Sequence, residues 1–452
     1  MSRSRLNFSQ LEEAVEDGLV DTVLVVITDM QGRLQGKRCD ARFFLDEVAE
    51  HATEGCSYLM AVDVDMNTVD GYAMSSWGTG YGDFVMRPDL ASLRVLPWHE
   101  RSVLCQADLT WEDDSPVEPS PRRILQRQNA RLNDRGWTGL AGTELEFILF
   151  EDRYEDAWRN GYRNMTPANS YNVDYSILGT SRVEPLLGRI RREMSGAGMT
   201  VESVKGECNL GQHEIAFRYD ELVAKADEHA LYKTGAKEIA AQEGCSLTFM
   251  AKFDEREGNS CHIHLSLRDS DGEPIFAGAG EHGKSALFDS FLAGLLATLP
   301  DFTLLFAPNI NSYKRYAAGS FAPTAIAWGR DNRTCAYRLV GHGASLRVEC
   351  RVPGGDVNPY LAIAALVAGG LHGVDNDLPL GPVCAGNAYV ADLPRVPTTL
   401  SEAAALFEKS TVARVALGDE VVDHYTNMAR VELAAFESAV TDWERYRCFE
   451  RL

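Results

Sequence analysis

Three short segments of the chain alternate polar or ionisable side chains with apolar ones. They read GTELEF at residues 142–147, CHIHLSL at 261–267 and LRVECRV at 346–352. Successive side chains of a β-strand point to opposite faces, so each segment predicts a strand with one apolar face and one charged face. A fold that contains all three needs a sheet with a core on one side and a charged surface on the other.

The three predicted charged faces carry different chemistry. In chain order they hold Glu144 with Glu146, His262 with His264 and Ser266, and Arg347 with Glu349 and Arg351. Two adjacent carboxylates inside a protein need a cation or a shared proton to offset their repulsion and desolvation. Taken singly, the first segment is compatible with a solvated acidic face, the second with hydrogen-bonded core histidines and the third with an exposed ladder of charges.

A predicted hairpin over residues 200–219 adds two more carboxylates. If its turn falls at Asn209–Gly211, Glu207 and Glu214 come together and can join the first pair. Neutral imidazole, as in His262, is a good ligand for Mn²⁺ and a good partner for phosphate.

Five arginines accompany these groups along the chain. They are Arg315, Arg333, Arg338, Arg347 and Arg351. Planar guanidinium groups bind phosphate bidentately, so arginines near carboxylates and histidine suit a polyphosphate held with divalent metals. The combination favours phosphoryl transfer, in which metals and arginines neutralise the moving phosphoryl group. No P-loop, dinucleotide-binding fingerprint or kinase glycine-rich loop is present, which argues against the usual nucleotide-binding folds.

The composition restricts the partners and the compartment. The chain has 452 residues and a formal net charge of -22, so we expect neither nucleic acid nor membrane as a partner. The N-terminal segment lacks the apolar stretch of a secretory signal, and the run at 286–306 is interrupted by Asp289, Pro300 and Asp301. Ten cysteines without a C-x-x-C pair fit reduced thiols in the cytoplasm.

The pattern along the chain predicts an α+β architecture in two parts. A segment rich in proline and serine, SPVEPSP at 115–121, marks the boundary that we expect between residues 1–115 and 116–452. Helical periodicity predicts helices over 121–136, 183–198 and 225–244, and amphipathic helices from Leu400 onwards.

Six motifs, in this order and spacing, resemble the glutamine synthetase family from about Asp21 to Gly373. They are GTELEF, GECNLGQHE, GNSCHIHLSL, NSYKR, RDNRT and RVECRVPGGDVNPYL. The resemblance implies an N-terminal β-grasp domain at 1–115 and, at 116–452, a catalytic domain with a curved antiparallel sheet and surrounding helices. It also implies a homododecamer of two hexameric rings with active sites between neighbouring subunits.

The resemblance also assigns roles to single residues. One Mg²⁺ or Mn²⁺ is expected at Glu146, Glu207 and Glu214, and a second at Glu144, His262 and Glu349. ATP, which is a substrate, is expected against Glu202, His264, Ser266, Arg338 and Arg347. Glutamate is expected at Gly258, Arg315 and Arg351, and the transferred phosphoryl group at the catalytic pair Arg333 and Arg351.

The chain departs from the ammonium-using members of this family at the amine site. Those members carry a Gly-Tyr-Glu-Ala-Pro flap, whereas this chain reads GSFAP with Phe321 at the glutamate position. The matching N-terminal stretch is also altered, and Asp63, Asp65 and Asp70 are its acidic residues. Tyr389 lies near where some members carry an adenylylated tyrosine, but the surrounding pattern is poor and we do not predict that control.

An apolar ring in place of a carboxylate suits the carbon skeleton of a larger amine. The sequence therefore favours an ATP-dependent ligase that forms γ-glutamyl amides from glutamate and an organic primary amine, ethanolamine first and a polyamine such as putrescine next. Two alternatives stay open. One is an ammonium-using glutamine synthetase, and the other is an inactive structural or regulatory relative.

Overall fold

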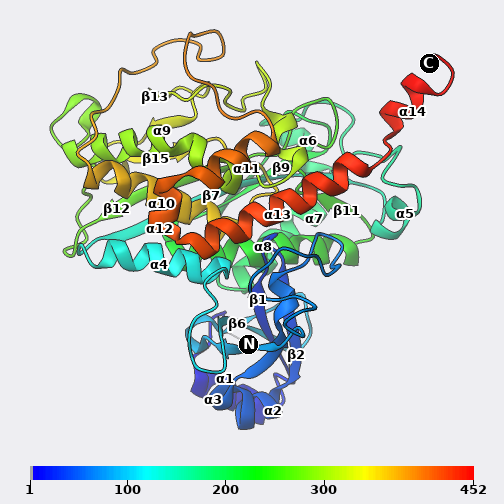
Figure 1. Cartoon of the computed structure of the whole chain (residues 1–452). Helices are drawn as coiled ribbons and strands as arrows, with labels where there is room; N and C mark the ends of the chain where they lie inside the picture. The colour runs from blue at the N-terminus through cyan, green and yellow to red at the C-terminus, as the bar shows by residue number, and fades with distance from the viewer. Residues whose placement is uncertain (1–3) are drawn as a thin grey trace.

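The computed structural model describes residues 4–452, which form two β-sheets with helices packed on them (Figure 1). The smaller sheet comes from the N-terminal part of the chain, blue to cyan in Figure 1, and lies below the larger one. This arrangement confirms the predicted α+β fold. The boundary at residues 115/116 stays a prediction.

The smaller sheet has six strands in the order β2-β1-β6-β4-β3, with β5 paired to β6. Its strands are β1 (Thr22–Thr28), β2 (Leu34–Asp40), β3 (Thr53–Cys56), β4 (Asp83–Pro88), β5 (Arg94–Val95) and β6 (Ser102–Thr110). The central strand β1, TVLVVIT, is buried along almost its whole length, as its β-branched sequence requires. Its pairing with β6 is parallel, and its pairing with β2 is antiparallel.

Short helices accompany this sheet. They are α1 (Phe8–Glu16), α2 (Ala41–Phe43), α3 (Ala49–His51) and the turns η1 (Phe44–Val48), η2 (Ser57–Met60) and η3 (Leu90–Ser92). Helix α1 begins with a capping box, in which Asn7 and Gln10 each accept a backbone hydrogen bond from the other. Its apolar stripe of Leu11, Ala14 and Val15 is buried, as helical spacing predicts.

The larger sheet has nine strands in the order β13-β14-β15-β12-β7-β9-β8, and β10 and β11 also pair with β7. The strands are β7 (Thr138–Phe150), β8 (Val201–Gly206), β9 (Gln212–Phe217), β10 (Asp220–Glu221), β11 (Ser246–Thr248), β12 (Cys261–Arg268), β13 (Trp328–Arg330), β14 (Tyr337–Val340) and β15 (Arg347–Cys350). All pairings are antiparallel except that of β13 with β14. The predicted hairpin is β8–β9, with its turn after Glu207.

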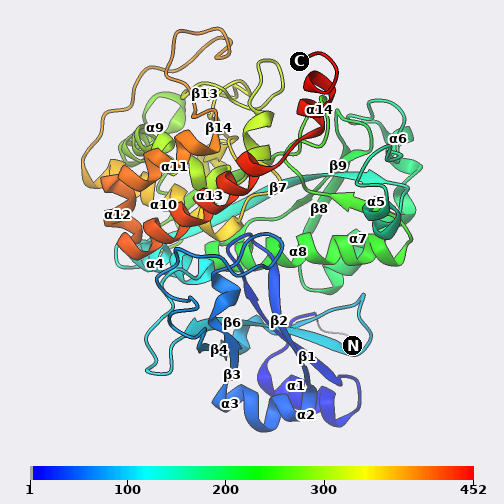
Figure 2. The same cartoon turned by 45° about the vertical axis from the view of Figure 1, so that its right-hand side comes forward.

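Among the described residues, the larger part contains eleven helices, of which α4, α7, α8 and those from Leu400 onwards overlap the ranges predicted to be helical. They are α4 (Pro121–Asn133), α5 (Tyr154–Arg159), α6 (Ile177–Ser181), α7 (Glu184–Gly196), α8 (Leu222–Gln242), α9 (Ala286–Phe306), α10 (Pro359–Asp375), α11 (Leu400–Lys409), α12 (Thr411–Leu417), α13 (Asp419–Ser438) and α14 (Asp442–Cys448), with the turns η4 (Glu281–Gly283), η5 (Ile310–Arg315) and η6 (Gly343–Ser345). Figure 2 shows α8 between the larger sheet and the smaller one.

Helix α9 is long and apolar enough to cross a membrane by composition alone. In the fold it packs against α10, and 61% of its most apolar window is buried. Phe288, Phe291 and Leu295 on its inner side are almost fully buried. We therefore interpret α9 as a core helix. Pro300 lies inside the helix and does not end it.

A buried polar network joins the two parts of the chain. Arg122 at the start of α4 binds Asp89 and Asp108 of the N-terminal part and Asp227 of α8 at 2.6–3.1 Å. Tyr360 Oη donates to Asp227 at 2.6 Å. Buried charges are tolerated when they are paired and hydrogen-bonded in this way, so the network fixes how the two sheets meet.

Candidate active site

The register of the larger sheet brings the three alternating segments together as neighbouring strands. Across these strands Glu144 lies opposite His262, and His264 opposite Glu349; on the other side of β7, Glu146 lies opposite Glu214 of β9. The alternate residues Leu145, Ile263 and Val348 are almost fully buried on the core side. The prediction of one apolar and one charged face is therefore confirmed, and on the charged face Glu146, His262 and Glu349 are buried.

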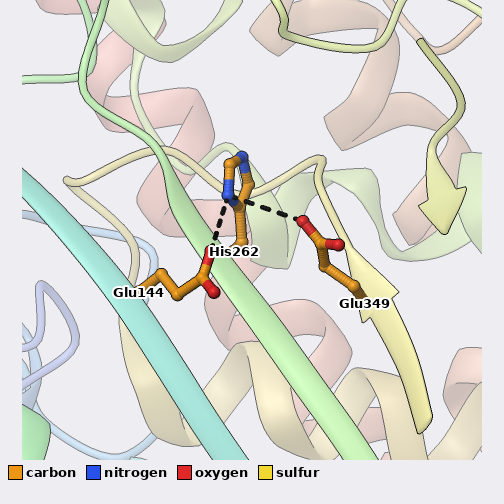
Figure 3. A group of neighbouring side chains, drawn as sticks. All are labelled: Glu144, His262 and Glu349. Atoms are coloured by element: carbon orange, nitrogen blue, oxygen red, sulfur yellow. Dashed lines mark hydrogen bonds and ion pairs between the residues drawn. The ribbon is translucent and has the colours of Figure 1, made fainter. Parts of the chain in front are cut away.

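One group of side chains comes from β7, β12 and β15 (Figure 3). His262 Nδ1 lies 3.2 Å from Glu144 Oε2 and 3.7 Å from Glu349 Oε1. His264 Nε2 contacts Glu144 Oε1 at 2.9 Å. Because Arg347 Nε donates to His264 Nδ1 at 3.1 Å, the proton of His264 is on Nε2 and points at Glu144.

The charge states of this group follow from its contacts. Burial opposes ionisation of Glu144, but the hydrogen bonds from His262 and His264 outweigh it and hold the pKa of Glu144 well below its usual range. Burial also opposes ionisation of Glu349, yet His262 and Arg351 lower its pKa overall. Both carboxylates are therefore ionised at neutral pH and able to bind a cation.

A second group consists of Glu146, Glu207 and Glu214, whose ligand oxygens lie within 4.8 Å of one another. Burial and the charge of Glu144 raise the pKa of Glu214 to about 8, although Lys205 acts in the opposite direction. The ammonium of Lys205 contacts Glu207 and lies 3.7 Å from Glu214. Burial is the largest cause of this raised pKa, and the charges of the neighbouring Glu144 and Glu146 add to it.

Both groups fit divalent cations. Each offers three converging donors, all oxygen in the second group and oxygen with one imidazole nitrogen in the first. Hard cations such as Mg²⁺ and Mn²⁺ take such donors. In the second group three carboxylates face one lysine, so their negative charge is not fully balanced by side chains within hydrogen-bonding or ion-pair distance.

A cavity of about 280 Å³ opens above both groups. Eleven of the residues predicted from the sequence line it: Glu144, Glu146, Glu207, Glu214, Gly258, His262, Phe321, Arg333, Arg338, Glu349 and Arg351. Arg338 Nη1 donates to Glu349 at 2.8 Å, and Arg351 also contacts Glu349. Six of the predicted carboxylate or imidazole groups and three of the predicted arginines thus share one cavity.

Five predicted substrate residues do not line this cavity. His264, Ser266 and Arg347 extend from it along β12 and β15, and Glu202 is exposed at a bulge in β8. Arg315 is buried behind the cavity, where it donates to the carbonyls of Val352 and Arg351 at 2.8 and 3.0 Å. The contact of Arg315 with glutamate therefore stays a prediction.

The predicted amine residues are not brought together within one chain. Phe321 lies at the mouth of the cavity and is 54% exposed. Asp63 lines a different, smaller cavity beside Met30 and Glu432, and the carbonyl of Asp70 accepts from Asn427. Neither they nor Asp65 belong to the residues that line the larger cavity among residues 4–452.

Sequence reasoning missed several residues of the site. Lys205 on β8 lies two positions before Glu207, which directly follows the strand, and that spacing was a usable signal. Gln212 Nε2 donates to Glu146 at 3.1 Å, and Ser260 N donates to the same carboxylate at 2.7 Å. Tyr175 lies under Lys205, 5.2 Å from its Nζ, and nothing in the local sequence indicated it.

Comparison with known proteins decides the family. The sequence-family model described as glutamine synthetase, catalytic domain, matches residues 118–448 of this chain. The chain is 66% identical over 447 residues to the gamma-glutamylethanolamide synthetase GlnA4 of Streptomyces coelicolor, covering 99% of this chain and 96% of that protein. This chain belongs to the glutamine synthetase family.

Two further likenesses agree with that membership. The glutamate–isopropylamine ligase of a Pseudomonas species is 36% identical, over 97% of both chains. A solved structure, the GmaS/ADP complex in conformation 1, superposes with a TM-score of 0.86 at 28% identity, covering 97% of this chain and 99% of that one. Ligases of the glutamine synthetase family use ATP and divalent metal ions, in keeping with the donor groups of this cavity.

Proposed function

We propose that this member of the glutamine synthetase family is an ATP-dependent ligase that joins glutamate to an organic primary amine, with ethanolamine favoured and putrescine next. The observation that carries the proposal is the 66% identity, over nearly the whole chain, to a gamma-glutamylethanolamide synthetase. The presence of Phe321 where ammonium-using members carry a glutamate supports an organic acceptor.

The chemistry needs an activated acyl group. A carboxylate is inert towards amines, so the γ-carboxylate of glutamate first attacks the terminal phosphorus of ATP, which releases ADP and gives γ-glutamyl phosphate. The amine nitrogen then attacks the acyl carbon, phosphate leaves, and the amine loses a proton. The net reaction forms one amide bond for each ATP cleaved to ADP and phosphate.

The side chains of the cavity have the charges that this sequence of steps requires. Arg333 and Arg351 would contact the transferred phosphoryl group, and Arg338 and Arg347 would contact the nucleotide with Glu202, His264 and Ser266. Gly258, Arg315 and Arg351 would hold glutamate. Cationic groups at fixed positions stabilise the charge of the transferring phosphoryl group without reorganisation.

We propose two divalent ions, Mg²⁺ or Mn²⁺, in each active site. Glu146, Glu207 and Glu214 would hold one, and Glu144, His262 and Glu349 the other. Such ions, when bound, neutralise the phosphate oxygens of ATP. Arg338 and Arg351, by their contacts with Glu349, keep that carboxylate ionised and oriented.

The acceptor side of the proposal rests on Phe321 and on a neighbouring subunit. Phe321 would offer apolar contact to the carbon chain of the amine. Asp63, Asp65 and Asp70 lie away from the cavity of their own chain, which supports a shared site if the chain forms the two hexameric rings expected of its family. We propose this dodecamer, a cytoplasmic location and domains at 1–115 and 116–452.

The experiment is phosphate release from ATP with Mg²⁺ and glutamate across a panel of ammonium, ethanolamine, putrescine, spermidine and no amine. We expect ethanolamine to stimulate release most strongly. Stimulation by ammonium alone would identify an ordinary glutamine synthetase with a rebuilt amine site. Absence of release with every amine would favour the inactive relative.

A further inference from the structure

A loop formed by residues 384–396 contacts two parts of the active site that are distant from each other in the sequence. One part is the segment 332–334, which contains Arg333. The other is the flap segment 317–322, which contains Phe321. Neither contact was indicated by the sequence, and the loop itself contributes no residue to the lining of the cavity.

On the phosphoryl side, the loop is hydrogen-bonded to both neighbours of Arg333. Asn332 Nδ2 donates to the carbonyls of Cys384 and Gly386 at 3.0 and 2.8 Å. Thr334 Oγ1 accepts from the backbone N–H of Ala388 at 3.0 Å. The N-terminal half of the loop is therefore fastened to the segment that carries the proposed phosphoryl-binding arginine.

On the amine side, the loop binds the chain that follows Phe321. Ile326 N donates to the carbonyl of Pro394 at 2.8 Å, and Val396 N donates to that of Thr324 at 3.2 Å. The phenol of Tyr389 reaches further into the flap and donates to the carbonyl of Ala322 at 3.0 Å. The side chain of Tyr389 thus connects the loop to Ala322, the residue that directly follows Phe321 in the flap.

Phe321 itself is in a position that needs support. Its φ is +59°, in the left-handed region that costs a bulky residue energy, and the residue is 54% exposed. Its own carbonyl accepts a long hydrogen bond of 3.4 Å from Arg351 Nη2. A residue in such a conformation keeps it only when neighbouring contacts over-determine the backbone.

We propose that Tyr389 is a positioning residue for the amine acceptor, because its hydrogen bond to Ala322 holds Phe321 at the mouth of the cavity. This inference rests on the proposed ligase function. It assigns to Tyr389 the selection of the acceptor amine over water. Water that reaches γ-glutamyl phosphate attacks the same acyl carbon, releases phosphate and returns glutamate, so ATP is consumed without amide formation.

The test is the variant Tyr389→Phe, which removes the hydroxyl and keeps the ring. One hydrogen bond corresponds to about a 3- to 10-fold effect, so we expect the KM for the amine to rise by that factor. The KM values for ATP and glutamate should stay within about twofold. Phosphate release per amide formed, measured with the wild type's preferred amine, should rise above one.

Tyr154→Phe is the matched control. Tyr154 Oη also donates to a backbone carbonyl, that of Leu247 at 2.8 Å, and it lies outside the cavity. Tyr154→Phe loses this bond and also the bond that Tyr154 Oη accepts from Leu247 N at 3.2 Å, so a general effect on stability would lower its melting temperature at least as much as that of Tyr389→Phe. Only Tyr389→Phe should change the KM for the amine and the coupling of ATP cleavage to amide formation.

The outcomes separate the inference from the proposed function. If the wild type forms amides with an organic amine and Tyr389→Phe keeps the wild-type KM for the amine and tight coupling, the positioning role is wrong. If the wild type responds to ammonium alone, the proposed acceptor is wrong, and the same two readouts taken with ammonium still decide the role of Tyr389. A fall in kcat with an unchanged KM for the amine would also overturn the inference.

Discussion

At the residue scale, the chemistry of the site depends on how its buried carboxylates are balanced by neighbouring cationic side chains. Glu349 is fully buried and contacts His262, Arg338 and Arg351. Together these contacts favour the ionised form of Glu349 and hold its side chain in place. Burial is therefore compatible with a charged carboxylate here because cations surround it.

Replacing Glu349 by glutamine keeps its shape and removes its charge. We expect Glu349→Gln to lower phosphate release by at least about 100-fold, because a proposed metal ligand is lost. Glu184→Gln on the surface of α7 is the control, and size-exclusion chromatography should show the same assembly for both variants. Wild-type turnover in Glu349→Gln would refute the metal assignment.

Lys205 offers a second residue-scale prediction. Its ammonium lies against Glu207 and Glu214, where it repels an arriving cation. Removal of one positive charge at this distance favours a divalent ion, so we expect Lys205→Gln to bind Mn²⁺ about 10-fold more tightly. Titration calorimetry with Mn²⁺ measures the change. Weaker binding would mean that Lys205 assists the site instead of competing with the ion.

At the element scale, the site depends on strand register and on one close backbone approach. The loop before β12 passes against the backbone at Ala251, and a Cβ at Gly258 would collide with the carbonyl oxygen of Ala251 and touch Arg315. Only glycine fits there without displacing the loop, and the loop lines the cavity.

We therefore expect Gly258→Ala to destabilise the protein by about 1–3 kcal/mol and to raise the KM for glutamate. Gly82→Ala is the matched control, since an added Cβ at Gly82 meets no atom within 4 Å. Thermal melting and glutamate titration of both variants check the prediction. Equal melting temperatures for the two variants would show that the loop adapts without cost.

The elements were largely predictable because their signals are local. The alternation in β7, β12 and β15 fixed which side chains share a face, and the turn after Glu207 fixed the hairpin. The path of the loop around Tyr389 was not predictable, since it depends on backbone carbonyls that any sequence supplies. The separation of Asp63 from Phe321 was also not predictable from the sequence, because it depends on how the two sheets pack against each other.

At the scale of the whole molecule, a buried histidine lies where α13 meets the N-terminal part of the chain. His424 on α13 is buried between Tyr72 and Tyr425, with its Nε2 2.9 Å from Met30 Sδ. Burial lowers the pKa of His424 to about 3. The folded protein therefore keeps this imidazole neutral, whereas the unfolded chain protonates it near pH 6.5.

A depressed folded-state pKa gives stability that is complete above the unfolded pKa and is lost as the pH falls towards the folded one. We expect the melting temperature of the wild type to fall from pH 7.5 to pH 5.5. His424→Phe should show a shallower fall, because it lacks a contribution to the free energy of unfolding that decreases by up to about 1.4 kcal/mol per pH unit below pH 6.5. Parallel curves for the two proteins would show that the burial of His424 does not make the stability of the protein depend on pH.

The central claim is that glutamate is activated as an acyl phosphate and transferred to an organic amine. Its most direct measurement is mass spectrometry of a reaction with ATP, Mg²⁺, ethanolamine and glutamate labelled with ¹⁸O in the γ-carboxylate. The account predicts γ-glutamylethanolamide that has lost one ¹⁸O atom and phosphate that has gained it. Unlabelled phosphate, or a reaction that forms no amide of ethanolamine, would contradict the account.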